Sequence, residues 1–219
     1  RKCLCERWTM ATSKELLGIA ASQIGVKENP PMSNNVKYNV WYYGREVSGR
    51  GYPWCMVFAQ WVFAKAGVGL PVRTASCGAL MRAAQSAGKW VTRDYQPGDV
   101  VIYDFPGGAM TGHCGIVESV DRGYISAIEG NTSSTNNADG GAVERRARKV
   151  SQIVGAYRPT FDKEVDDVRY NTVKECPGWA QDTIKKLVNK GLLNGTGQGF
   201  DLSLDMIRLL VILDRAGSL

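Results

Sequence analysis

The stretch YPWCMVFAQWVFAKAG, residues 52–67, predicts a helix that begins after a proline and ends at a glycine. Proline favours the first turn of a helix because its φ angle is already helical, and glycine is common where a helix ends. Between them, small and apolar side chains recur at helical spacing, at Cys55, Phe58, Ala59, Val62 and Ala66. Cys55 therefore lies in the first turn of a helix that has an apolar face.

The stretch GHCGIVESVDRGYISAIEGN, residues 112–131, predicts two antiparallel strands joined by the Asp-Arg-Gly turn at 121–123. Patterns typical of further strands lie at 99–105, 142–149 and 153–158, and patterns typical of further helices lie at 12–25 and 75–87. Residues 32–52, rich in glycine, asparagine and aromatic side chains, are predicted to form an ordered loop. Helices that precede antiparallel strands predict an α+β domain in which the N-terminal helices pack on the sheet.

The chain divides into a larger and a smaller part. A length of 219 residues corresponds to between one and two domains, at roughly 150 residues per domain. We predict one domain over 10–159, then a polar and acidic linker, and then a small helix-loop-helix module over 170–219. Residues 1–9 precede a methionine that is a natural start, and we expect them to be a native arm or an upstream remnant.

The composition is that of a soluble globular protein. Hydrophobic residues make up 44% and charged residues 22% of the chain, which excludes a disordered, collagen-like or coiled-coil protein. No apolar run approaches the roughly 18 to 20 residues that cross a bilayer, so we expect no membrane span.

The net charge of +6 suits a polyanionic partner. Strand alternation places Glu144, Arg146 and Arg148 on one face, which we interpret as solvent-exposed, and we expect no nucleic-acid partner.

The six cysteines show no metal-binding spacing. They contain no Cys-x-x-Cys pair, and His113 is the single histidine, so we expect no metal site. Because residues 1–9 do not resemble a secretory signal, we expect synthesis in a reducing compartment and mostly free thiols. Cys77 and Cys114 are interpreted as small core residues, because buried cysteines commonly fill that role.

Cys55 and His113 are the residues at which nucleophilic chemistry is expected. A helix N-terminus lowers the pKa of a thiol, because its free N–H groups stabilise the thiolate. Such a nucleophile needs a base within hydrogen-bond reach, and His113 is the only imidazole of the chain. A third group would orient the imidazole, and both Glu129 and Asn131 lie on the paired strand at the end where His113 stands. The residues alone leave the choice between these two open.

Three segments, in this order, resemble the CHAP family, the cysteine- and histidine-dependent amidohydrolases and peptidases of phage endolysins and bacterial cell-wall hydrolases. They are YPWC at 52–55, GHCGIV at 112–117 and IEGN at 128–131, and the resemblance spans roughly residues 12–158. It implies a papain-like (NlpC/P60-like) fold, in which the helix with the cysteine packs on the antiparallel sheet with the histidine. The NlpC/P60 endopeptidases themselves usually show Asp-Cys-Ser-Gly at the nucleophile, where this chain has Trp-Cys-Met-Val.

The resemblance implies that Cys55 is the nucleophile, His113 the general base, Glu129 the residue that orients the imidazole, and Asn131 an auxiliary polar group. The implied activity is hydrolysis of an amide bond of peptidoglycan through an acyl-enzyme, in a phage or prophage endolysin that we expect to be a monomer. We expect an endopeptidase. An N-acetylmuramoyl-L-alanine amidase would use the same residues, and the alternative from another class is a protein that binds the cell wall without cleaving it.

No cofactor is expected. Some CHAP members carry an acidic calcium-binding loop before the cysteine, whereas 47–51 supplies no carboxylate here, so we expect no calcium requirement. The tail resembles the helix-loop-helix unit of S-layer-homology repeats at 179–180, 191–195 and 206–208, which implies attachment to the cell wall. Because residues 1–9 do not resemble a secretory signal, we expect synthesis in the bacterial cytoplasm and action at the wall after release.

Overall fold

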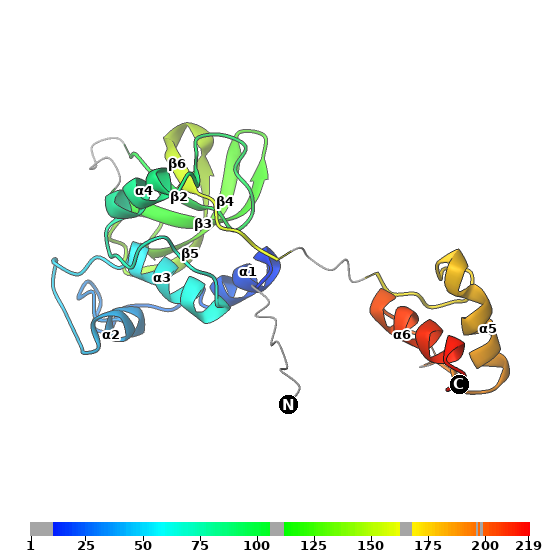
Figure 1. The fold of residues 1–219 in the computed structure, drawn as a ribbon. Helices are drawn as coiled ribbons and strands as arrows, with labels where there is room; N and C mark the ends of the chain where they lie inside the picture. Colours follow the sequence, from blue (N-terminus) through cyan, green and yellow to red (C-terminus); the bar gives the residue numbers. More distant parts are fainter. Residues whose placement is uncertain (1–10, 106–111, 163–167, 196, 198) are drawn as a thin grey trace, which may run out of the picture. The chain divides into compact units, whose positions relative to one another are not determined.

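The computed structural model describes residues 11–105, 112–162, 168–195, 197 and 199–219 (Figure 1). The chain forms two compact units, Arg1–Glu164 and Val165–Leu219. Each unit has its own clusters of buried apolar side chains among the described residues. The predicted domains, 10–159 and 170–219, fall one within each unit.

The first half of the larger unit contributes helices. They are α1 (Ser13–Ala21), α2 (Lys37–Tyr43), α3 (Cys55–Ala66) and α4 (Cys77–Ser86). A capping box begins α1: Glu15 N donates to Thr12 Oγ1 at 3.2 Å, and Thr12 N donates to Glu15 Oε2 at 2.8 Å. The helix α3 ends where Gly67 adopts a left-handed φ of 69°, as the sequence pattern predicts.

The prediction of a loop over 32–52 is wrong at its centre, where α2 forms. Val36 precedes α2, and no side chain among the described residues caps it, so the sequence carries no start signal there. Packing against α3 stabilises the helix instead. The Tyr38 ring lies 5.2 Å from the rings of both Phe58 and Trp61, measured between centroids. Tertiary contacts thus stabilise a helix that is too short to be stable alone.

A six-stranded antiparallel sheet follows the helices. Its strands are β1 (Trp90–Val91), β2 (Val100–Tyr103), β3 (His113–Asp121), β4 (Tyr124–Thr132), β5 (Ala142–Lys149) and β6 (Ile153–Tyr157). Their order across the sheet is β1-β6-β2-β3-β4-β5. The sequence pattern misses β1, because two residues are too few to show alternation.

The helices α1, α3 and α4 lie against one face of this sheet, and α2 packs on α3 (Figure 1). The main core lies between them, and its large buried side chains include Trp54, Phe58, Leu80, Ile116 and Ile128. A smaller apolar cluster on the other face of the sheet includes Val101, Tyr103, Val117, Ile125 and Ala127. The prediction of an α+β domain with N-terminal helices packed on an antiparallel sheet is confirmed.

The second unit is built on α5 (Gln181–Asn189) and α6 (Leu204–Arg215), preceded by a 3-10 turn at Gly178–Ala180. Its buried side chains include Ala180, Ile184, Ile207 and Val211. Thr183 Oγ1 donates to Asp214 Oδ2 at 3.0 Å, and Lys186 forms an ion pair with the same carboxylate. These contacts join α5 to α6. Within the described ranges of the chain, no helix is long and apolar enough to cross a membrane.

Candidate active site

Cys55 is the first residue of α3, and the segment that leads to it is held in place. The buried Asn39 side chain donates to Tyr52 O at 3.0 Å. The indole of Trp54 donates from Nε1 to Glu28 Oε1 at 2.8 Å. The first N–H groups of a helix have no partner within that helix, so they remain available to stabilise negative charge at Cys55.

His113 is the first residue of β3 and lies opposite Tyr103 of β2. Its ring stacks on that of Tyr103, with the centroids 5.9 Å apart. His113 Nε2 lies 2.9 Å from Glu129 Oε2. The other ring nitrogen, Nδ1, is buried and has no hydrogen-bond partner in the part of the chain that the structure describes. Since Glu129 occupies Nε2, Nδ1 is the ring atom that remains for the Cys55 sulfur.

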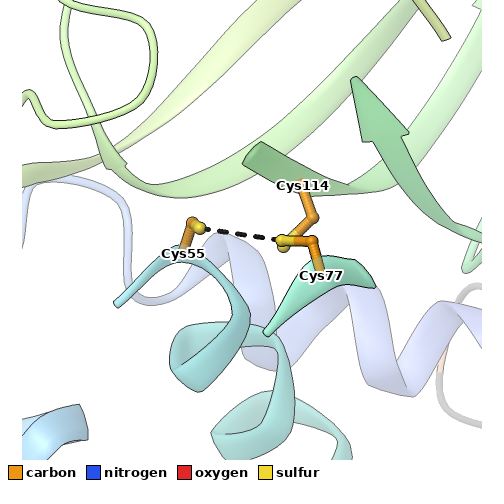
Figure 2. A group of neighbouring side chains, drawn as sticks. All are labelled: Cys55, Cys77 and Cys114. Carbon is orange, nitrogen blue, oxygen red and sulfur yellow. Dashed lines mark hydrogen bonds between the residues drawn. The ribbon is translucent and has the colours of Figure 1, made fainter. Parts of the chain in front are cut away.

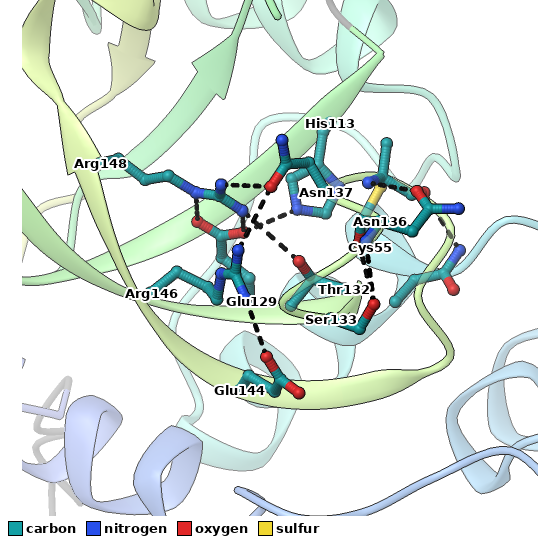
Figure 3. A network of polar contacts seen from close by, with 12 residues as sticks. Cys55, His113, Glu129, Thr132, Ser133, Asn136, Asn137, Glu144, Arg146 and Arg148 are labelled. Atoms are coloured by element: carbon teal, nitrogen blue, oxygen red, sulfur yellow. Dashed lines mark hydrogen bonds and ion pairs between the residues drawn. The ribbon is translucent and has the colours of Figure 1, made fainter.

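The Glu129 carboxylate is held on its other side by Arg148 of β5 (Figure 3). Arg148 Nε donates to Glu129 Oε1 at 2.8 Å, and Nη2 donates to Glu129 Oε2. The same guanidinium donates from Nη1 to Asn137 Oδ1 at 2.7 Å. A bidentate pair of this kind fixes the plane of the carboxylate as well as its position. Glu129 is therefore a rigid acceptor for the imidazole.

The interpretation of the β5 face as solvent-exposed is wrong for Arg148. Alternation does place Glu144, Arg146 and Arg148 on one face of the strand. Arg148, however, is only 5% exposed, because the Glu129 carboxylate and an aromatic ring cover it. The guanidinium carbon lies 4.8 Å from the centroid of Phe105, within the range of a cation–π contact. The charge pattern of β5 alone gives no sign of this burial.

Asn131 contacts the loop after β4 rather than the imidazole. Its Nδ2 donates to Asp139 Oδ1 at 3.3 Å and to Ala138 O at 3.5 Å, and its Oδ1 accepts from Gly141 N at 3.2 Å. The residue has a left-handed φ of 56°, where the loop departs from the pairing with β5. Among the described residues, the amide of Asn131 forms no hydrogen bond with His113, although the sequence places both at the open end of the hairpin. Asn131 therefore holds the loop that follows β4.

Burial and neighbouring charges set the protonation of His113. Burial disfavours a charged imidazole, but interactions with Cys55 and Glu129 favour the imidazolium, outweigh burial and raise the pKa of His113 from 6.5 to about 9. Burial also opposes the charge on Glu129, yet Arg148 and then His113 lower the pKa of that carboxyl. At neutral pH His113 is therefore an imidazolium beside a carboxylate.

Two further cysteines lie against Cys55 (Figure 2). Cys77 begins α4, Cys114 follows His113 in β3, and the Sγ atoms of all three cysteines lie within 4.8 Å of one another. Interactions with Cys114 and Cys77, and then with His113, lower the pKa of Cys55 well below its ordinary value, although burial opposes this. Cys77 and Cys114 are core residues, as predicted, but the sequence gives no signal that they border the candidate nucleophile.

Two glycines allow the elements of the site to approach one another. A Cβ atom at Gly115 would lie 2.7 Å from Glu129 Cγ and 3.0 Å from the Tyr103 hydroxyl. A Cβ atom at Gly130 would lie 2.6 Å from Phe58 Cβ, so glycine lets β4 pack closely on α3. The close packing around Cys55 and His113 thus depends on the absence of a side chain at both positions.

Residues 47–131 match the family model of the CHAP domain. The matched segment contains Cys55, His113, Glu129 and Asn131. Together with the helices packed on an antiparallel sheet, this match confirms the predicted papain-like fold. No curated protein sequence matches the chain.

The chain is also similar to solved structures. The crystal structure of Ly7917 aligns with a TM-score of 0.42 and 20% identity over 68% of this chain and 62% of that one. Ly7917 with the hydrolyzing product of MDP gives the same score and identity, over 63% of that chain. The wild type endolysin LysIME-EF1 aligns with a TM-score of 0.45 and 14% identity, over 70% of this chain and 66% of that one. The chain spans less than two thirds of the length of each of these proteins.

Proposed function

We propose that this protein is a peptidoglycan hydrolase that cleaves an amide bond with Cys55 as its nucleophile. The supporting observation is the set of contacts in Figure 3 that joins a buried imidazole to a carboxylate and the carboxylate to a guanidinium, together with a thiol at a helix N-terminus that interacts with the same imidazole. A thiolate, an imidazolium, a carboxylate and a guanidinium alternate in charge, so each stabilises the ionised form of its neighbour. The match of residues 47–131 to the CHAP domain supports the same substrate class.

The first half of the proposed reaction forms an acyl-enzyme. The Cys55 sulfur attacks the carbonyl carbon of the substrate, and the N–H groups at the start of α3 stabilise the oxyanion that forms. The carbon–nitrogen bond then breaks, and His113 gives its proton to the leaving amine. A thioester on Cys55 and a neutral imidazole remain.

The second half releases the acyl group. His113 takes a proton from a water molecule, whose oxygen attacks the thioester carbon. The carbon–sulfur bond breaks, the acyl group leaves as a carboxylic acid, and Cys55 returns as a thiolate next to an imidazolium. Glu129 keeps Nε2 fixed and compensates the positive charge in the resting state, while Arg148 holds Glu129. Glu129 and Arg148 are positioning residues, because they act on the substrate only through His113.

Within this proposal the protein is an endopeptidase that cuts the stem or cross-bridge, and it acts as an endolysin at the wall after it leaves the bacterial cytoplasm. An amidase would use the same thiol, imidazole and carboxylate on a different amide.

The net charge of +6 suits an anionic wall. The second unit is proposed to attach the enzyme there, and it exposes two large side chains, Trp179 at 51% and Leu192 at 61%.

Mass spectrometry of the fragments released from purified peptidoglycans of several cross-bridge types tests the proposal. The chain should release shortened or uncross-linked stems that are still attached to muramic acid. Free stem peptides would instead establish the amidase reaction. The Cys55→Ala variant should release neither, whereas Cys176→Ala, which removes a cysteine of the second unit, should act like the unchanged chain. Release of the same fragments by Cys55→Ala would overturn the assignment of Cys55 as the nucleophile. If the unchanged chain releases no fragments from any wall, the protein is better explained as one that binds the wall without cleaving it.

A further inference from the structure

Three thiols meet in the core of the first unit although they come from three elements (Figure 2). Cys55 begins α3, Cys77 begins α4, and Cys114 lies in β3. All three are free and buried. Their Sγ atoms lie within 4.8 Å of one another, and those of Cys55 and Cys77 are 4.0 Å apart. The proposed hydrolysis uses only one of these sulfurs as a nucleophile.

The spacing of the sulfurs fits an ion held at their centre. Bonds of about 2.3 Å from three sulfurs to an ion in their plane place the sulfurs about 4.0 Å apart. Cys55 and Cys77 already have this separation. A small contraction of the remaining separations, which are at most 4.8 Å, closes the triangle around the ion. Side-chain rotation supplies such a shift without moving the helices.

The surroundings of the three sulfurs favour a soft ion. The thioether Met56 Sδ lies 4.0 Å from Cys114 Sγ, the His113 ring interacts with Cys55, and the three thiols are otherwise part of the apolar core. Thiolate and thioether groups select soft ions such as Cu(I), whereas Mg²⁺ and Ca²⁺ require oxygen ligands. Both α3 and α4 begin at one of the cysteines, and helix N-termini favour the negative charge of a thiolate site.

We propose that Cys55, Cys77 and Cys114 together bind one soft, thiophilic ion of the Cu(I) class. Cys77 and Cys114 each release a proton to solvent as their bonds to the ion form, Cys55 binds as the thiolate it already is, and no electron is transferred. The ion occupies the Cys55 sulfur, which then cannot attack a carbonyl carbon. Binding is independent of the proposed hydrolysis, and only the resulting inhibition rests on it. The spacing of the cysteines along the sequence predicted no metal site, because that spacing gives no information about cysteines that are distant in the sequence and close in the fold.

Measurement of bound copper tests the site directly. The full chain with Cys3→Ser and Cys5→Ser serves as the reference, since the Cys-x-Cys pair near the N-terminus is a competing thiol group. Reduced protein is loaded anaerobically with Cu(I) in the presence of a competing chelator, desalted, and assayed for copper per chain. The reference should hold one equivalent.

Matched serine variants in the same reference assign the ligands. Cys77→Ser and Cys114→Ser should each weaken binding more than about 100-fold, because removal of a ligand should cost more than removal of a group that only orients a ligand, which costs up to about 100-fold. Cys176→Ser, which removes a buried cysteine outside the cluster, should leave binding unchanged. Equal copper affinity in all of these variants would overturn the site.

Copper-edge X-ray absorption on the reference protein gives a readout that does not depend on whether the variants fold. The site predicts a first shell of three sulfur atoms at about 2.3 Å. A shell dominated by nitrogen or oxygen, or one of two sulfurs only, contradicts it.

Hydrolysis measured on the same samples separates this proposal from the proposed function. Copper-loaded protein should lose its activity on peptidoglycan and regain it when a chelator removes the ion. Full activity of the loaded protein would overturn the inhibition. If copper-free protein has no activity, the proposed function fails, while the copper content and the absorption spectrum still decide whether the site exists.

Discussion

Arg148 and Glu129 are both buried, and each compensates the charge of the other. Replacing Arg148 with methionine should lower the free energy of unfolding by about 3 to 5 kcal/mol, because it leaves a buried carboxylate without its partner. Urea denaturation measures this change. The control is Arg145→Met on the same strand: Arg145 pairs with Glu118 at the surface, and its loss should cost no more than about 1 kcal/mol. Similar losses in both variants would contradict the buried pair.

The raised pKa of His113 sets the pH range of the site. Because this pKa is raised from 6.5 to about 9 in the folded protein, the imidazolium stabilises the fold fully below pH 6.5, and this contribution is lost as the pH rises through about 9. The same proton serves the leaving amine. We therefore expect kcat/KM for peptidoglycan fragments to fall above pH about 9.

Glu129→Gln tests the cause of that raised pKa. The amide carries no charge, so the pKa of His113 should fall, and the alkaline limit of activity should move to lower pH. The reaction should also slow by about 10²- to 10⁴-fold in kcat, since a mispositioned acid–base group loses most of its effect. Glu144→Gln is the matched control, because Glu144 lies opposite Glu129 in the ladder and pairs with Arg146 instead. An unchanged pH profile in Glu129→Gln would show that His113 is charged for another reason.

The sequence leaves few candidates for the residues of the site. His113 is the only histidine of the chain and so the only candidate imidazole base, and Pro53 marks the start of the helix in which Cys55 lies. The sequence could not choose between Glu129 and Asn131, because both lie at the same end of the strand. It also missed Arg148, whose burial depends on Phe105 and on the neighbouring strand. The burial of Arg148 arises when the strands pair and pack, so the sequence of β5 alone does not predict it.

At the scale of elements, periodicity predicted the long helices and strands and failed for the short ones. α2 has seven residues, about two helical turns, and β1 has two, so both are too short for the hydrophobic pattern to repeat often enough to identify them. Each is stabilised by its neighbour: α2 by aromatic rings of α3, and β1 by pairing with β6. Short elements of this kind depend on contacts that are distant in the sequence.

Gly130 tests how closely β4 and α3 must pack. Gly130→Ala should destabilise the protein by about 1 to 3 kcal/mol, because the new methyl group overlaps Phe58 and forces the two elements apart. Thermal or urea unfolding measures the loss. Gly18→Ala is the control: Gly18 lies inside α1 with open space around its Cβ position, and alanine there should stabilise the helix by about 0.5 to 1 kcal/mol. Equal effects at the two positions would show that close packing is not required.

At the scale of the whole molecule, the two units have separate apolar cores among the described residues. A chain that ends after Glu164 should therefore keep the catalytic fold and hydrolyse soluble peptidoglycan fragments. It should bind intact cell walls more weakly, because the second unit is the proposed wall attachment. Co-sedimentation with purified walls measures binding, and fragment release measures hydrolysis. Undiminished sedimentation of the shortened chain would remove the attachment role from the second unit.

The central claim is that Cys55 carries the acyl group during catalysis. Acid quenching of the reaction with peptidoglycan fragments, followed by proteolysis and mass spectrometry, shows which side chain holds that group. The account predicts a stem-peptide acyl group on the peptide that contains Cys55, absent from the Cys55→Ser variant. An acyl group on Cys77, or turnover with no acylated peptide at any quench time, would contradict the mechanism.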